Sequence, residues 1–95
     1  MAEHWPFEDP ANLAVITLKR ILAKERAILL ATHDDDGGWQ FLDGQSVSVE
    51  DAAVVALRGI TEIDPSINEL ADLPRGWRAS RGSQDGLWIR SAKGH

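Results

Sequence analysis

Two apolar runs on either side of an Asp-Gly turn constrain the fold of this chain more than any other feature. Residues 27–32 and 39–42 are almost wholly apolar, and the polar segment between them contains Asp36-Gly37. A type I′ turn needs positive φ angles, which Asp-Gly adopts readily, so two β-like runs around that dipeptide predict a hairpin. A chain that begins a sheet in this way needs further strands or helices to cover its apolar face.

The length of the polar loop predicts one register for this hairpin. A loop over residues 36–37 or over residues 35–38 places Asp34 opposite Trp39 and Thr32 opposite Phe41. Ile28, Leu30, Trp39 and Phe41 would then share one face of the hairpin, with Leu29, Ala31 and Leu42 on the other. Because both faces are apolar, we expect residues 27–32 to form a central strand of the sheet.

The first half of the chain also predicts an arm, a short strand and two helices. Prolines interrupt residues 1–12, which we expect to be an extended arm with Trp5 and Phe7 docked on the domain. A strand over residues 14–16 precedes a helix over 17–24 with Thr17 as its N-cap. Ser48 is a candidate N-cap for a helix over 49–62. Residues 52–57 are equally compatible with an extended segment, followed by a shorter helix from residue 57.

The second half begins with a helix signal and ends with another hairpin. Asp64 as N-cap and Pro65 at the first helical position predict a helix over 65–72. Residues 77–81 and 87–90 form a second hairpin whose register the sequence leaves open, and residues 92–95 are expected to be a flexible tail. At 95 residues there is room for one core. We therefore predict a single α+β domain over 13–91, with a mostly antiparallel sheet of two hairpins plus the N-terminal strand and two or three covering helices.

The charge of the chain is unevenly distributed. Residues 1–72 hold 14 acids and 5 bases, whereas residues 73–95 hold 5 bases and 1 acid, within a formal net charge of −5. A net acidic chain disfavours nonspecific contact with nucleic acid or an anionic membrane. There is no cysteine, no signal-peptide pattern and no stretch of about 20 apolar residues, so we expect a cytoplasmic protein without a membrane span.

No constellation of catalytic or metal-binding residues accompanies these patterns. Asp34, Asp35 and Asp36 are adjacent rather than alternating, which differs from a calcium loop, and they predict a solvated turn. His33 next to them would point to the opposite face from its neighbours on a strand. We therefore expect no catalytic residues, no metal and no cofactor, and we expect Trp39, Trp77 and Trp88 to lie in the core.

An ordered string of aromatic and turn residues carries a family resemblance. The string is Gly37-Gly38-Trp39-Gln40-Phe41-Leu42-Asp43-Gly44, then Asp64-Pro65-Ser66-Ile67, then Asp72-Leu73-Pro74-Arg75-Gly76-Trp77-Arg78-Ala79-Ser80-Arg81, and finally Trp88. Over residues 13–90 it resembles a small bacterial domain family of uncharacterised function that is classed in part among the immunity proteins of polymorphic toxin systems. The resemblance implies a protein-binding domain that occludes a toxin.

Two functions from different classes follow from these patterns. For a protein-binding domain, the candidate residues for a basic partner are Asp34, Asp35, Asp36, Glu50 and Asp51, chosen for their charge. For the alternative, a nucleic-acid-binding or regulatory module, the candidates are Arg75, Arg78, Arg81 and Trp88. The sequence favours the first and leaves the partner, the strand order and the oligomeric state open.

Overall fold

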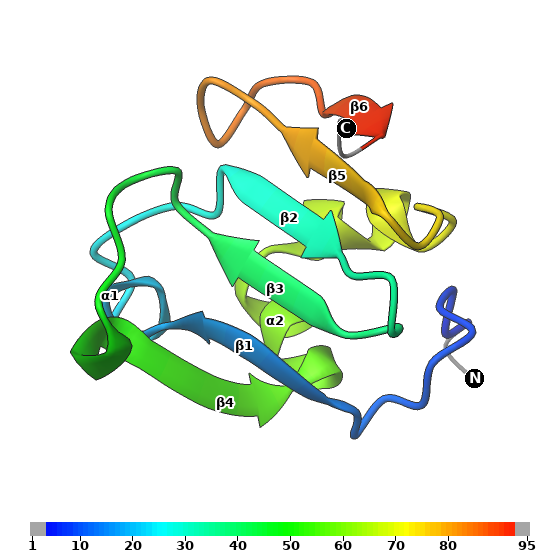
Figure 1. Ribbon diagram of the computed structural model, residues 1–95, viewed down its shortest axis with the longest axis horizontal. Coiled ribbons are helices and arrows are strands. Elements are labelled where there is room, and N and C mark those ends of the chain that lie inside the picture. Colours follow the sequence, from blue (N-terminus) through cyan, green and yellow to red (C-terminus); the bar gives the residue numbers. More distant parts are fainter. Residues whose placement is uncertain (1–3, 93–95) are drawn as a thin grey trace.

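A mixed sheet forms one layer of the molecule, and α2 and η2 cover one of its faces (Figure 1). This computed structural model describes residues 4–92. In chain order the elements are β1 (Ala14–Leu18), α1 (Lys19–Leu22), β2 (Leu30–His33), β3 (Trp39–Leu42), η1 (Val49–Asp51), β4 (Ala52–Ala56), α2 (Leu57–Ile63), η2 (Pro65–Leu70), β5 (Trp77–Ser80) and β6 (Ile89–Ala92). Helices η1 and η2 are 3-10 helices. None of the described helices is long and apolar enough to cross a bilayer.

The strand order of the sheet is β4-β1-β3-β2-β5-β6. β1 runs parallel to β3, and the other neighbouring pairs are antiparallel. The α+β class, the two hairpins and the N-terminal strand are therefore confirmed, and β2 is a central strand as expected. The parallel pair makes the sheet mixed, and β4 adds an edge strand.

The core lies between the sheet and the helices. Trp39 and Phe41 of β3 and Val15 of β1 are buried on the covered face of the sheet. Leu57, Ile60, Ile67 and Leu70 of α2 and η2 pack against it. Trp39 is buried as predicted, and Trp77 and Trp88 are partly buried against the same cluster.

The predicted register of the first hairpin is wrong by one residue. His33 pairs with Trp39 and Ala31 with Phe41. Asp34 donates its N–H to the Gly38 oxygen, which leaves a three-residue loop, and Gly37 takes a φ of 93°. A glycine with positive φ after a type I turn forms the bulge typical of such loops, so the strands shift. Ala31, and not Leu30, therefore shares the buried face with Trp39 and Phe41.

All three predicted helices are shorter than expected. Thr17 is not an N-cap, because it lies in β1 and donates its hydroxyl to the Phe41 oxygen at 2.8 Å. The helix predicted over 49–62 is wrong, because Ala52–Ala56 pairs with β1 and the helix begins only at Leu57, as the alternative had it. Asp64 is an N-cap with Pro65 after it, as predicted, although the helix that follows is a 3-10 helix ending at Leu70.

The N-terminal arm docks on the sheet through its aromatic residues. Phe7 is buried and meets Trp39 edge-on, with ring centroids 5.6 Å apart. Trp5 donates its Nε1–H to the backbone oxygen of Asp9 at 2.7 Å. Docking is thus confirmed for the described part of the arm. Residues 1–3 and 93–95 lie outside the described residues, and Ala92, predicted to begin a tail, closes β6.

Candidate functional site

The acidic turn of the first hairpin is held in shape by its own carboxylates. Asp36 accepts a hydrogen bond from the Gly38 N–H at 2.9 Å, and Asp34 accepts one from the Gln40 amide at 3.1 Å. Asp35 and Asp36 are exposed. The turn therefore presents negative charge at a fixed place at one end of the sheet.

The loop before β5 lies directly against this turn. Gly76 donates its N–H to the His33 oxygen at 2.7 Å and takes a φ of 81°. This positive φ favours glycine, and a Cβ on Gly76 would lie only 2.7 Å from an Asp35 carboxylate oxygen, so that side chain would have to move. The Arg75 guanidinium lies over Gly37, at 3.0 Å from where a Cβ would stand. Arg75, one of the candidate residues for nucleic-acid binding, therefore lies against the acidic turn.

A hollow of about 290 Å³ opens between this loop and the N-terminal arm. Its lining residues are Glu8, Asp9, His33, Ala71, Asp72, Leu73, Pro74 and Arg75. The His33 ring stacks on Trp39 with centroids 3.9 Å apart, and its Nδ1 lies 2.7 Å from the Leu73 oxygen. Because a carbonyl oxygen can only accept, Nδ1 carries the hydrogen of this bond. Trp39 in turn donates to an Asp9 carboxylate oxygen at 2.9 Å.

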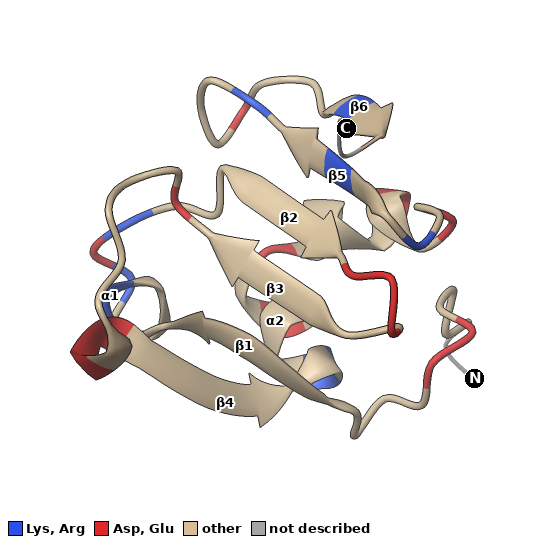
Figure 2. Cartoon of the chain, viewed as in Figure 1, with Lys and Arg blue, Asp and Glu red and all other residues tan. Residues whose placement is uncertain are grey.

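Acidic residues from three parts of the chain gather around this hollow. We define the acidic end as Glu8, Asp9, Asp34, Asp35, Asp36 and Asp72, together with Arg75. Figure 2 shows their segments on the same side of the molecule, at the turn after β2, in the arm and in the loop before β5. Arg90 reaches Asp72 at 2.8 Å, and its hydrogen bond holds the pKa of that carboxyl below its usual value. Counting Arg75 and Arg90 against the six acids leaves a local formal charge of −4, close to the −5 of the whole chain.

The remaining two acidic candidates lie elsewhere. Glu50 and Asp51 belong to η1, at the other end of the strands (Figure 2). The Ser48 N–H bonds to Asp51, which lowers the pKa of this carboxyl, and Arg20 lies 3.4 Å away from it. The five predicted residues therefore do not form one surface, and Asp51 caps η1.

An ion pair that the sequence analysis missed lies beside Asp51. Arg20 contacts Asp43 at 2.6 Å, and Arg26 approaches the same carboxylate at 3.4 Å. The hydrogen bond from Arg20 lowers the pKa of Asp43 to about 2. The Asp43 side chain is fully covered, so this pair ties α1 to the end of β3.

The four residues of the alternative site lie in three different places, because Arg75 is in the loop before β5 and the other three are divided between the two faces of the sheet. Arg81 is buried and directs its guanidinium to Asp64, to Ser66 and to the Ile28 oxygen. Trp88 lies against it, with the guanidinium carbon 4.1 Å from the ring centroid. Arg78 is exposed on the face of the sheet that α2 and η2 leave open. A continuous basic and aromatic surface is therefore not formed.

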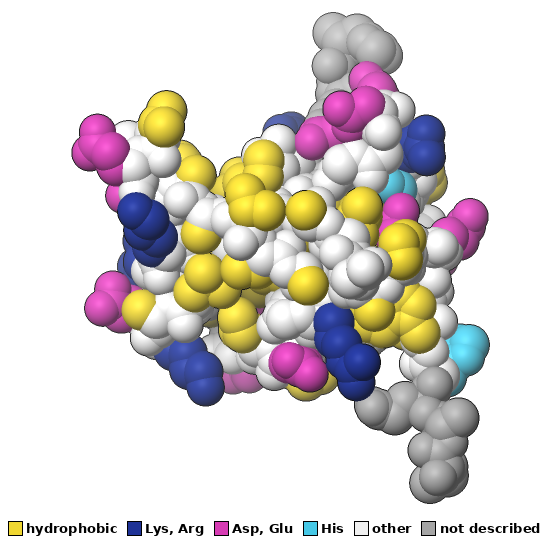
Figure 3. Space-filling view, turned by 90° about the horizontal axis from the view of Figure 1, so that it is seen from below, with side chains coloured by type: hydrophobic (Ala, Val, Ile, Leu, Met, Phe, Trp, Pro, Cys, Tyr) yellow, Lys and Arg dark blue, Asp and Glu magenta, His cyan; other side chains and the backbone are white. Residues whose placement is uncertain are grey.

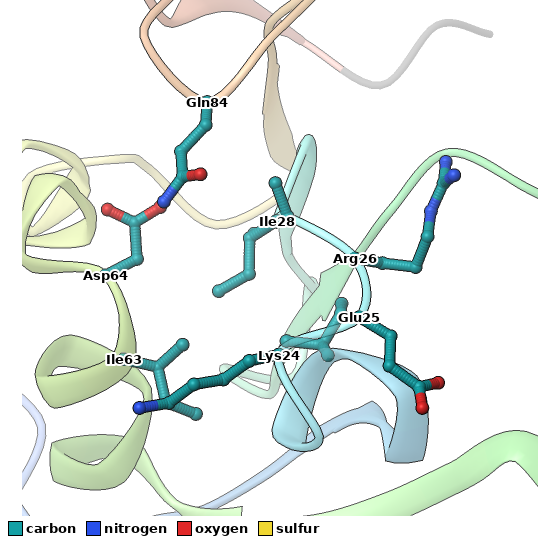
Figure 4. Close-up of a pocket in the computed structure, with 9 residues that line it drawn as sticks. Lys24, Glu25, Arg26, Ile28, Ile63, Asp64 and Gln84 are labelled. Atoms are coloured by element: carbon teal, nitrogen blue, oxygen red, sulfur yellow. The ribbon is translucent and has the colours of Figure 1, made fainter.

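A second hollow, of about 360 Å³, lies between α1, α2 and the loop after β5 (Figure 4). Lys24 extends toward Ile63, and Gln84 points toward Asp64. Asp64 is already bound to Arg81.

Within residues 4–92 no group of three or more histidine, aspartate or glutamate side chains is placed to hold a metal ion. Comparisons of the chain with protein-family models, curated proteins and solved structures found no match.

Proposed function

We propose that this chain is a protein-binding domain of the immunity-protein type and that its acidic end binds a basic protein, such as a toxin. The observation that carries this proposal is the local charge of −4 gathered from three separate segments of the chain. Complementary charge speeds association and selects partners more than it adds affinity. We propose further that the domain acts in the cytoplasm by binding alone, without catalysis or a cofactor.

The hollow at the acidic end suits the side chain of a lysine or arginine. Its lining combines the apolar Ala71 with the exposed Glu8 carboxylate and with Asp72, which Arg90 already contacts, and it also includes Arg75. A long basic side chain buries its methylene groups on apolar surface while its charged head stays near acids and water. Such a pocket beside an acidic rim would supply an anchor of the kind that dominates interface energetics.

The test is the association of this domain with a basic, toxin-like protein, sought first among the products of the neighbouring genes. The variant Glu8→Lys with Asp35→Lys reverses two exposed acids of the acidic end. We expect it to lower the association rate by about tenfold at low salt, and we expect the rate for the wild type to fall as salt rises. The matched control, Glu25→Lys with Asp85→Lys, changes the net charge equally at exposed positions outside the acidic end.

Two outcomes would contradict the proposal. Equal slowing by both double variants would show that only net charge matters and that the acidic end is not the binding surface. Purification of the domain with nucleic acid and no protein, with binding lost on Arg78→Glu, would favour the alternative module.

A further inference from the structure

β4 forms an edge of the sheet without the usual protection of an edge strand. The strand order places β4 beside β1 alone, and within the described chain no other strand pairs with its outer side. Its sequence, Ala52-Ala53-Val54-Val55-Ala56, contains no charge and no proline, and its pairing with β1 runs without a bulge. The opposite edge strand, β6, contains Arg90. Because proteins usually block an exposed edge with charges, prolines or bulges, β4 is open to pairing with another strand.

The backbone groups of Val54 point away from the sheet. Leu57 donates its N–H to the Leu13 oxygen at 2.8 Å, and these two residues continue the register of β1 with β4. Hydrogen-bonded pairs alternate along an antiparallel ladder, so Val55 bonds to β1 and Val54 faces outward. The N–H and C=O of Val54 are thus oriented toward an added strand.

We propose that a second copy of this chain pairs with β4 as an antiparallel strand, about a two-fold axis at Val54. In this register each Val54 exchanges both N–H···O bonds with the Val54 of the other copy. Ala56 donates its N–H to the Ala52 oxygen of the other copy. Ala52 already donates its own N–H to the Val49 oxygen, so only its carbonyl oxygen is left to bond to the added strand. The two sheets become one continuous sheet, with the self-complementary interface of a two-fold dimer.

The same register brings opposite charges together at both ends of the interface. Glu50 in η1 precedes β4 and Arg58 in α2 follows it. Antiparallel pairing therefore sets the acidic end of one β4 beside the basic end of the other, with Glu50 near the Arg58 of the other copy. Figure 2 shows acidic residues in the short helix before β4 and a basic residue at the start of α2, beyond the other end of the strand. Both side chains are largely exposed, and Arg58 has Glu62 of its own helix at 3.6 Å. This complementarity favours a second copy over an unrelated strand, because antiparallel pairing of β4 with itself brings ends of opposite charge together.

The open face of the sheet at this edge is apolar. Val54 is 69% exposed and its neighbour across β1, Ile16, is 41% exposed. Figure 3 shows apolar side chains gathered along the β4 side of the molecule, with charged side chains mainly around them. Pairing would bring the two Val54 side chains together between the two Ile16 side chains. Because a single strand pair buries less than the roughly 1,200–2,000 Å² of stable interfaces, we expect a weak dimer with a dissociation constant on the order of 100 μM.

Sedimentation equilibrium of the whole chain from roughly 10 μM to roughly 1 mM tests this pairing, because the range brackets the expected dissociation constant. We expect the mean mass to rise from one copy toward two. Val54→Lys should weaken the dimer by at least about tenfold, because it places two ammonium groups side by side across the axis. Val54→Thr is the matched control, since it stays β-branched and uncharged and should still dimerise. A wild type that remains a monomer across the range, or a Val54→Lys variant that dimerises as the wild type does, would overturn the proposal.

A charge exchange tests the register. Glu50→Lys and Arg58→Glu should each weaken the dimer by roughly threefold, and the double variant should recover the wild-type affinity. A double variant as weak as either single variant would exclude this register. In addition, the Val54 amide should exchange its hydrogen more slowly at high protein concentration, whereas the Val55 amide, already bonded to β1, should not change. Equal Val54 exchange at both concentrations would exclude pairing through β4.

Discussion

Arg81 at the end of β5 binds Asp64 at the start of η2, and both residues are buried. The same arginine also donates to the Ile28 oxygen at 2.8 Å. One guanidinium therefore ties a strand, a helix cap and the segment before β2 together. A buried ion pair is expensive to desolvate, but removing one partner is worse, because the other charge is left unpaired.

Arg81→Met should lower the free energy of unfolding by about 3–5 kcal/mol, because it leaves the Asp64 carboxylate buried without its counter-ion. Urea denaturation followed by tryptophan fluorescence measures this change. Arg78→Met, three residues earlier and exposed, makes the same substitution and should cost less than about 0.5 kcal/mol. Similar losses for the two variants would show that Arg81 is not held as described.

Trp39→Ala should lower the free energy of unfolding by about 3–5 kcal/mol, because Trp39 is 2% exposed and contacts Phe7, Phe41 and His33. A loss of that size is a large part of the stability of a small domain, so the variant should be partly unfolded at 25 °C. Circular dichroism during urea titration measures it. The control is Ile89→Ala on β6, where the side chain is 68% exposed and the cost should be small.

Gly37→Ala should destabilise the domain by about 1–2 kcal/mol. Gly37 has a φ of 93°, and a Cβ there would stand 3.0 Å from the Arg75 guanidinium. Gly59→Ala is the matched control and should change stability in the opposite direction, because Gly59 lies inside α2 with nothing within 4 Å of an added Cβ. It should stabilise by about 0.5–1 kcal/mol. Thermal denaturation should show a lower melting temperature for Gly37→Ala and a higher one for Gly59→Ala than for the wild type. Shifts of the same sign would contradict the positive φ of Gly37 or the helical position of Gly59.

Asp43→Asn should cost on the order of 1–2 kcal/mol at neutral pH, because the pKa of Asp43 is lowered to about 2 by its hydrogen bond from Arg20. Since folding lowers this pKa, the contribution is fully present above the unfolded value of about 4 and disappears as the pH falls through about 2. Urea midpoints of the wild type and variant should therefore converge between roughly pH 4 and pH 2. Asp85→Asn, on an exposed loop, should show no such convergence. A difference between Asp43→Asn and the wild type that stays constant with pH would exclude this ion pair.

Local patterns predicted the parts of the fold that local chemistry decides. The Asp-Gly signal located the first hairpin, and Asp64-Pro65 located the start of η2, because turn and cap geometry depend on adjacent residues. The register of that hairpin was missed by one residue, because the loop contains a glycine bulge at Gly37 rather than a symmetric turn.

The features that local patterns did not predict depend on contacts between segments that are distant in the sequence. Residues 52–56 are alanine and valine, which suit either a helix or a strand, and their position beside β1 determined which one forms. The acidic turn was predicted, whereas its association with Asp72 and Arg75 required the tertiary contact between Gly76 and His33. Arg81 was expected to pair with the acidic helices, but neither its partner Asp64 nor the pair of Asp43 with Arg20 was identified, because nothing in the sequence links these residues.

The position of β1 in the sheet determines the order in which the strands can pair while the chain is being synthesised. Among the described strands β1 is synthesised first, yet both of its neighbours, β3 and β4, come later in the chain. The β2–β3 hairpin closes over a short loop and can form as soon as it emerges, whereas the pairing of Ala14 must wait for Ala56. A nascent chain that ends before residue 56 therefore carries an apolar β1 without its outer neighbour, and an unpaired apolar strand of this kind favours aggregation.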